Sequence, residues 1–116
     1  MHGVGIDLLE IERLERAIAR RPGLADRLFT NGERAYAARR ARPAQHLAAR
    51  FCAKEAVAKA LALDVLRWQE IEVTGEGGAP RIRLHGATAT AAAAAGDVRV
   101  SLTHTDRTAG AVAVVG

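Results

Sequence analysis

The segment from Gln45 to Leu63 is the feature that most constrains how this chain can fold. It contains no Gly or Pro and is dominated by Ala, Leu, Lys, Glu and Arg, which predicts a single long α-helix. Glu55 and Lys59 fall one turn apart on a helix face that is otherwise uncharged. They form either a surface ion pair that stabilises the helix or a partly buried site for a metal or a cationic partner. The spacing alone leaves both interpretations open.

The distribution of lysine favours the second interpretation. Of 17 basic residues, only Lys54 and Lys59 are lysines, and they lie on either side of Glu55. Lysine is a compact charge that suits a single phosphate oxygen, whereas arginine offers a planar fork. The pattern suggests phosphate near this helix.

The length and composition predict one small domain spanning residues 1–116. A chain of this size buries about two-thirds of its unfolded surface. Aromatic residues make up only 3%, so we expect self-association to supply part of the missing apolar burial. Cys52 is the single cysteine, which excludes an internal disulfide. No apolar run reaches spanning length and the first residues lack signal-peptide features, so we expect a cytoplasmic protein with no membrane partner.

The charge is unevenly placed along the chain. The formal net charge is +4, with the excess positive charge in residues 1–60. Such a surface suits an acidic protein, a phosphorylated small molecule or a nucleic acid. No nucleic-acid-binding motif is recognisable, so we expect no nucleic-acid partner.

Hydrophobic periodicity and turn residues predict an α+β fold, with a long central helix packed on a mostly antiparallel sheet. The expected strands are 4–8, 71–73, 82–84, 98–104 and 109–115; the expected helices are 10–20, 24–29, 31–42, 45–63 and 87–95. Residues 75–80 are expected to form the turn of a hairpin. The strand 109–115 is apolar on both faces, so it should lie centrally in a sheet or be covered by a partner subunit.

Asp7 and Glu55 are carboxylates on separate elements, which suits a hard cation such as Mg²⁺. His104 ends an apolar strand face and is either a hydrogen-bonded structural residue or part of a site. No Walker loop, Rossmann fingerprint or Ser-His-acid pattern is present. The residues by themselves therefore suggest Mg²⁺-assisted phosphate chemistry.

Three motifs, in order and over essentially the whole chain, resemble the holo-acyl-carrier-protein synthases, which are 4′-phosphopantetheinyl transferases. The first is GIDLLEIER at residues 5–13, the second is RFCAKEAVAKAL at residues 50–61, and the third is SLTHT at residues 101–105 followed by AGAVAVV at residues 109–115. This family transfers the phosphopantetheine arm of coenzyme A to a serine of apo acyl carrier protein and releases adenosine 3′,5′-bisphosphate. The resemblance implies an enzyme of fatty acid and lipid biosynthesis with a 4′-phosphopantetheinyl transferase-like fold.

The resemblance also implies roles for individual residues. Asp7 and Glu55 would hold Mg²⁺ and, with Lys59, form the catalytic centre, in which Lys59 contacts phosphate oxygens. Residues implied to bind coenzyme A are Arg50, Lys59, Pro80 and His104. Residues implied to bind the acidic carrier protein are Arg13, Arg16 and Arg20. Members of the family assemble as trimers, so we expect a homotrimer with its active sites at subunit interfaces, where His104 approaches the carboxylates from a neighbouring subunit.

One departure from the family pattern follows the long helix. The family has a Gly-Thr-Gly turn there, whereas this chain has Ala62-Leu63-Asp64, which could alter the nucleotide pocket or extend the helix by a turn. Two alternative functions stay open: a non-catalytic basic module that binds an acidic carrier protein, and another Mg²⁺-dependent enzyme acting on a coenzyme A-like nucleotide. The sequence does not identify the general base, for which a water held by Glu55 or Asp7 is the favoured choice. Nor does it identify the carrier protein or the tolerance for acyl-coenzyme A.

Overall fold

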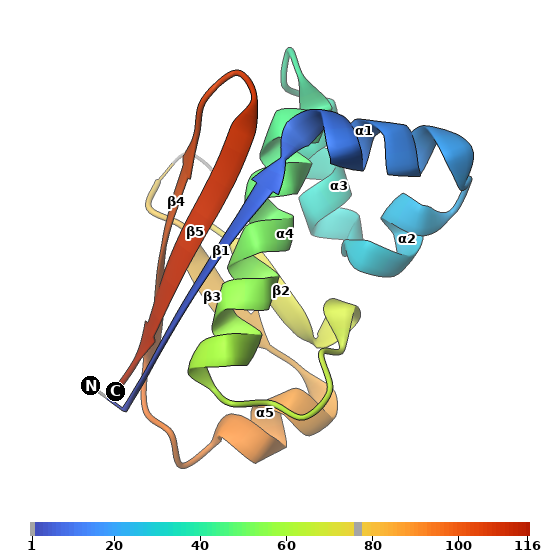
Figure 1. Ribbon diagram of the computed structural model, residues 1–116. Helices are drawn as coiled ribbons and strands as arrows, with labels where there is room; N and C mark the ends of the chain where they lie inside the picture. Colours follow the sequence, from blue (N-terminus) through green and yellow to red (C-terminus); the bar gives the residue numbers. More distant parts are fainter. Residues whose placement is uncertain (1, 76–77) are drawn as a thin grey trace.

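The chain forms an α+β structure in which one long helix lies across a three-stranded sheet (Figure 1). The computed structural model describes residues 2–75 and 78–116. In chain order, the elements are β1 (Gly3–Glu10), α1 (Ile11–Arg20), α2 (Leu24–Leu28), α3 (Asn31–Ala38), α4 (Pro43–Ala60), the 3₁₀ helix η1 (Trp68–Glu70), β2 (Ile71–Thr74), β3 (Arg81–Leu84), α5 (Gly86–Ala92), β4 (Val98–His104) and β5 (Thr108–Val115). The expected hairpin 71–84 is present as β2 and β3, but part of its turn, residues 76 and 77, lies outside the described residues.

The sheet has the strand order β1-β5-β4, and both pairs are antiparallel. Ile6 of β1 pairs with Val112, and Val112 pairs with Ser101 of β4. The apolar strand β5 is therefore central, as its residues on both faces predict. This register carries Asp7 to the face of the sheet that α4 covers, opposite Val4, Ile6 and Leu8.

Helix α4 approaches β1 so closely that only glycine fits between them. A Cβ atom on Gly5 would lie 2.0 Å from the carbonyl oxygen of Ala56, and one on Gly3 would lie 2.0 Å from that of Ala60. These glycines allow direct packing of strand on helix backbone. The close approach brings β1 and α4, which carry the two candidate carboxylates, into direct contact.

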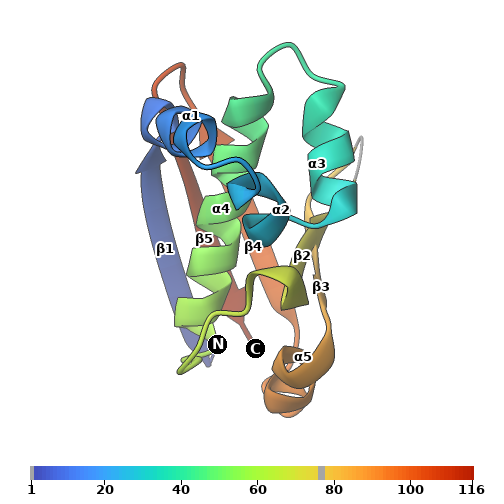
Figure 2. The ribbon, with the colours of Figure 1, turned by 90° about the vertical axis from the view of Figure 1, so that its right-hand side faces the viewer.

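The burial of α4 explains its unusual composition. Helices α1, α2 and α3 lie on the side of α4 away from the sheet, and the β2–β3 hairpin lies beside α4 with β3 next to β4 (Figure 2). The helix is therefore enclosed on most sides and needs small apolar residues nearly all round. Its buried residues are Leu47, Ala48, Ala49, Arg50, Cys52, Ala53, Lys54, Ala56, Val57, Ala58 and Ala60.

Three helix ends differ from the sequence-based expectations, and the first is that of the helix expected at 87–95, which ends at Ala92. The helix expected at 31–42 begins with the predicted capping box at Thr30 and Glu33 but ends at Ala38. The proline at position 43 restricts only Arg42, which is non-helical, so it does not by itself set the end at Ala38. Helix α4 ends at Ala60, so the missing Gly-Thr-Gly turn does not extend it. Instead, Ala62 adopts a positive φ of 52°, and the amide of Leu63 donates to the carbonyl of Ala58 at 3.0 Å. This is a Schellman motif with alanine at the position that glycine favours.

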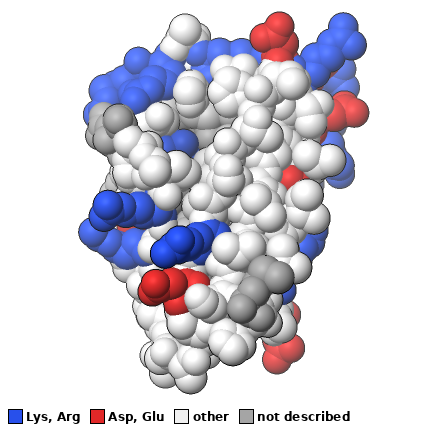
Figure 3. Space-filling view, turned by 90° about the vertical axis from the view of Figure 1, so that its left-hand side faces the viewer, with Lys and Arg blue, Asp and Glu red and all other residues white. Residues whose placement is uncertain are grey.

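The face of the sheet opposite α4 is apolar and exposed. Val4, Ile6 and Leu8 are 56%, 64% and 68% exposed, and Val112 beside them is 36% exposed. Figure 3 shows this side of the molecule as a broad uncharged area with charged side chains gathered mostly toward its margins. Within residues 2–75 and 78–116, no helix is both long and apolar enough to cross a membrane.

Candidate active site

Asp7, Glu55 and Lys59 lie together where β1 packs on α4. The ammonium group of Lys59 donates to the carbonyl of Ile6 at 2.9 Å and lies 3.4 Å from Oδ1 of Asp7. Asp7 is largely enclosed, with 19% of its side chain exposed, whereas Lys59 is 52% exposed. The structure therefore brings together the three residues that the sequence predicts as the catalytic centre.

The two carboxylates are close enough to affect each other's chemistry. Burial and then the negative charge of Asp7 raise the pKa of Glu55, whereas Lys59 acts in the opposite direction. Burial, followed by the charge of Asp7, raises the pKa of the adjacent Cys52 thiol to about 12. Cys52 therefore stays protonated and is no nucleophile. The carboxylate pair is a region of negative potential that a cation would relieve.

An open groove of about 430 Å³ adjoins the pair. Asp7 and Glu55 line it together with Arg13 and a set of apolar side chains. The apolar lining is contributed by Leu8, Leu9, Leu14, Ala17, Leu24, Leu28 and Phe51. The ring of Phe51 stacks on Trp68 with centroids 4.8 Å apart. The groove thus presents an apolar surface beside two carboxylates and one arginine, Arg13.

The three predicted carrier-binding arginines all lie on α1, but only Arg13 lines this groove. Arg16 is paired with Glu12 one turn earlier on the helix. Arg20 is exposed in the last turn. The helix therefore places one predicted residue beside the carboxylates and the other two on adjoining surface.

Arg50 lies on the other side of α4 from Glu55. Five residues of helix rotate one side chain by about 140° relative to the other, and the cavity that Arg50 lines shares no residue with the groove at Glu55. This second cavity, of about 180 Å³, is also lined by Gly32, Tyr36 and Glu72. Within one chain, the predicted coenzyme A residue Arg50 and the carboxylates therefore open onto different surfaces.

The guanidinium group of Arg50 is held over the ring of Tyr36, 3.8 Å from its centroid, although Arg50 is only 7% exposed. Its Nε is buried and has no hydrogen-bond partner among the described residues. Burial is the main cause of a lowered pKa for Arg50. A buried donor of this kind is costly when it is left unpaired, which makes the cavity suited to an anion.

His104 lies on the same side of α4 as Arg50. Its ring makes an edge contact with His46, at 5.9 Å between centroids, and His46 makes a similar contact with Tyr36 at 5.7 Å. Pro80 lies beside Gly75, another residue of the Arg50 cavity, because a Cβ on Gly75 would be 3.2 Å from the Cα of Pro80. The predicted nucleotide residues Arg50, His104 and Pro80 are therefore grouped around one region.

The sequence reasoning missed two residues of this second group, namely Tyr36 and His46. Arg40 also lies over the ring of Tyr36, at 3.8 Å. Burial and the positive charge of the neighbouring basic residues lower the pKa of His46. Tyr36 and Arg40, like His46 and Arg50, are four residues apart in segments expected to be helical, so one-turn spacing was the available signal.

Lys54 does not belong to the site, contrary to the suggestion from its position beside Glu55. It is fully buried on the side of α4 that faces the other helices, where it pairs with Glu33. Residues five positions apart on a helix point about 140° apart, so Lys54 and Lys59 reach different surroundings. Only Lys59 is available to an external phosphate.

The fold and this arrangement match one class of protein. The 4′-phosphopantetheinyl transferase superfamily matches residues 3–113, and the chain belongs to this family. A curated relative, the holo-[acyl-carrier-protein] synthase of Moorella thermoacetica, is 51% identical over 116 residues, which cover 96% of this chain and 91% of the relative.

Solved structures agree with this assignment. The acyl carrier protein synthase of Mycobacterium tuberculosis is 41% identical and superposes with a TM-score of 0.80, covering 99% of this chain and 96% of that one. The Helicobacter pylori holo-[acyl-carrier-protein] synthase in complex with coenzyme A is 25% identical, with a TM-score of 0.84, covering 97% of this chain and 99% of that one.

Proposed function

We propose that this protein transfers the 4′-phosphopantetheine group of coenzyme A to a serine hydroxyl of apo acyl carrier protein and releases adenosine 3′,5′-bisphosphate. The observation that carries the proposal is that Asp7 and Glu55 together line a largely apolar groove, with Lys59 paired to Asp7 beside it. The relatives named above act on acyl carrier protein, and one is a complex with coenzyme A. Family membership makes the protein a transferase.

Asp7 and Glu55 would hold Mg²⁺. Their donor set fits the ion, because Mg²⁺ prefers oxygen ligands and usually keeps waters and phosphate oxygens as its remaining ligands. Within the part of the chain that the structure describes, no cluster of three or more His, Cys, Asp or Glu could hold a metal, so two protein ligands are the expected complement. Bound Mg²⁺ would neutralise charge on the diphosphate of coenzyme A.

The remaining residues act on the substrate by position and charge. Lys59, whose ammonium group is exposed beside Asp7, would contact oxygens of the diphosphate. Arg50, His104 and Pro80 would bind the nucleotide end, where the positive charge of Arg50, which lines the second cavity, would attract an anionic group. Neutralisation and positioning of this kind are the main sources of rate in phosphoryl-type transfer.

We propose a homotrimer whose active sites lie between subunits. The carboxylates and Arg50 open onto opposite sides of α4 in one chain, so one coenzyme A molecule can meet both groups most directly when they come from different subunits. The exposed apolar face made by Val4, Ile6, Leu8 and Val112 offers the contact surface (Figure 3). Exposed apolar areas of this kind are typical of subunit interfaces.

The carrier protein would dock on α1 and the adjoining groove. Arg13 lies on the rim of that groove, and Arg16 and Arg20 extend the basic surface along the helix. An acidic partner would be attracted to these side chains and guided toward the carboxylate pair. A cytoplasmic location follows from the sequence expectation and forms part of this proposal.

The test is mass spectrometry of apo acyl carrier protein after incubation with this protein, coenzyme A and Mg²⁺. A mass increase equal to one phosphopantetheine group supports the proposal, and Glu55→Gln should abolish it while the exposed control Glu12→Gln should not. Carrier binding without a mass change would favour the non-catalytic basic module. Consumption of coenzyme A without carrier modification would favour a different enzyme acting on this nucleotide.

A further inference from the structure

The ammonium group of Lys59 already neutralises one of the two carboxylates that would hold the metal. Lys59 begins in the last turn of α4 and reaches β1, where it contacts the carbonyl of Ile6 at 2.9 Å and Oδ1 of Asp7 at 3.4 Å. The side chain therefore bridges the two elements that supply the carboxylates. In the free protein it acts as an internal cation at this position.

Lys59 can leave this position easily, whereas the carboxylate cannot. Half of the Lys59 side chain is exposed, at 52%, while Asp7 is only 19% exposed. Asp7 lies on a strand paired at Ala111 and packed directly against α4. An ion pair with a separation of 3.4 Å and one half-exposed partner is weak, so a competing anion can draw the lysine away.

Because of the charges around it, Lys59 should have a measurable effect on metal binding at this site. The carboxylates of Asp7 and Glu55 repel each other, and Lys59 offsets that repulsion. A metal ion that binds to the free protein must therefore compete with Lys59 for Asp7. A diphosphate gives Lys59 another anionic partner and leaves Asp7 available to the metal.

We propose that Lys59 couples the two ligands: it weakens divalent-metal binding to the free protein and strengthens it once a diphosphate is bound. The proposal rests on the function proposed above and adds an order of events to it. Because coupling between two ligands is reciprocal, the metal should strengthen coenzyme A binding by the same factor. Lys59 is then a positioning residue for the metal as well as a contact for the substrate.

Mn²⁺ binding followed by electron paramagnetic resonance tests the coupling without depending on turnover. In the absence of coenzyme A, Lys59→Met should bind Mn²⁺ about two- to fivefold more tightly than the unchanged protein, the range expected for the loss of an exposed ion pair. The factor by which coenzyme A strengthens Mn²⁺ binding should fall in the same variant. Lys59→Arg, which keeps the charge, should stay close to the unchanged protein.

Arg21→Met is the matched control, because Arg21 is exposed at the end of α1 and its loss changes the net charge equally. It should leave Mn²⁺ affinity unchanged, whereas an increase equal to that of Lys59→Met would overturn the inference. Circular dichroism checks the fold of each variant, and Lys59→Gln serves as a second neutral substitution.

The outcomes separate this inference from the proposed function. If both neutral Lys59 variants bind Mn²⁺ no more tightly than the unchanged protein does, the coupling is overturned. This holds even if the unchanged protein transfers phosphopantetheine normally. If the unchanged protein neither binds coenzyme A in the presence of Mn²⁺ nor modifies the carrier, the proposed function itself fails and the coupling fails with it. If the neutral Lys59 variants bind Mn²⁺ more tightly than the unchanged protein, and coenzyme A strengthens their Mn²⁺ binding by a smaller factor, both the coupling and the proposed function are supported.

Discussion

Nζ of Lys54 lies 2.6 Å from Oε1 of Glu33, and both side chains are fully buried. The same ammonium group donates to the carbonyl of Leu28 at 2.8 Å and to that of Trp68 at 2.7 Å, so its three donors are all used. These contacts join α4 to the end of α2, to α3 and to the start of η1. The ion pair therefore holds α4 in position one residue before Glu55.

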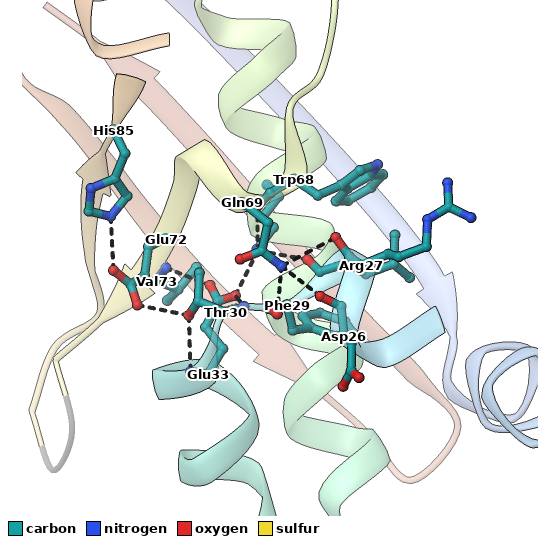
Figure 4. A network of polar contacts seen from close by, with 12 residues as sticks. Asp26, Arg27, Phe29, Thr30, Glu33, Trp68, Gln69, Glu72, Val73 and His85 are labelled. Atoms are coloured by element: carbon teal, nitrogen blue, oxygen red, sulfur yellow. Dashed lines mark hydrogen bonds and ion pairs between the residues drawn. The ribbon is translucent and has the colours of Figure 1, made fainter. Parts of the chain in front are cut away.

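The carboxylate of Glu33 is equally well satisfied. It accepts the amide of Thr30 at 2.8 Å as part of the capping box and the amide of Val73 at 2.7 Å. Glu72, on the neighbouring strand position, accepts from the hydroxyl of Thr30 at 2.7 Å and contacts His85 at 3.0 Å (Figure 4). The pair is thus the centre of a network that links α3 to the second sheet.

Lys54→Met should lower the free energy of unfolding by about 3–5 kcal/mol, because it leaves the buried Glu33 carboxylate without its cation. Urea unfolding followed by circular dichroism measures the loss. The double variant Lys54→Met/Glu33→Gln should lose clearly less than the sum of the two single changes, since neither charge then remains alone. Additive losses would contradict the view that the two residues act as one unit.

The ionisation of Glu55 should respond in opposite directions to its two charged neighbours. Asp7→Asn should lower the pKa of Glu55, because it removes a negative charge that opposes ionisation, and Lys59→Met should raise it. The carboxyl carbon shift of Glu55 in NMR titrations reports both changes. A titration midpoint that is unchanged by both substitutions would show that the three groups do not interact.

Reversing the charge at Arg13 and Arg16 should weaken carrier binding mainly by slowing association. The effect should shrink at high salt, because exposed charges are screened. Stopped-flow association kinetics with apo carrier protein provide the measurement, and Arg67→Glu, an exposed position outside α1 and outside the apolar sheet face, is the control. An equal loss of coenzyme A affinity would instead assign this helix to the nucleotide pocket.

Val112→Asp should dissociate the proposed trimer and abolish activity together, although Val112 lies outside the candidate site. The substitution places a charge in the middle of the exposed apolar sheet face, where burial in an interface would be costly. Light scattering reports the assembly state. A fully active monomer at assay concentration would rule out the composite site.

Mixing inactive Glu55→Gln and His104→Ala subunits gives an independent test of that interface. The hybrid should recover part of the activity, because one interface can combine an intact carboxylate pair with an intact His104. Subunit exchange is verified by mass spectrometry with one isotope-labelled variant. A complete lack of recovery despite proven exchange would show that both groups act within one subunit.

Ala62→Gly should stabilise the protein by about 1 kcal/mol, because alanine is strained at the positive φ that closes α4. Thermal unfolding measures the gain. The control is Ala19→Gly in α1, where glycine should instead destabilise an exposed helical position by about 1 kcal/mol. A destabilising Ala62→Gly would mean that the observed backbone conformation is not costly.

The local pattern of apolar, polar and turn residues was sufficient to predict most of the helices and strands. Apolar residues alternate with others around Asp7, and α4 contains no glycine or interior proline. Both patterns reflect interactions between residues a few positions apart, and such interactions depend only on residue type and spacing. The capping box at Thr30 was predicted correctly for the same reason, and the central position of β5 is one of the two alternatives that its apolar pattern left open. The end of α3 and the alanine-closed end of α4 were not predicted correctly, because tertiary packing and backbone strain decide them.

The sequence by itself determined the family, through its three motifs, and it predicted Asp7, Glu55 and Lys59 as the residues of the catalytic centre. Only the tertiary structure decided how they are arranged, because contacts between distant segments depend on how closely backbones pack. Two glycines let β1 meet α4 and bring Asp7 to Lys59. The same packing buries Lys54 against Glu33 and turns Arg50 to the opposite side of the helix, although all these residues of α4 belong to one motif.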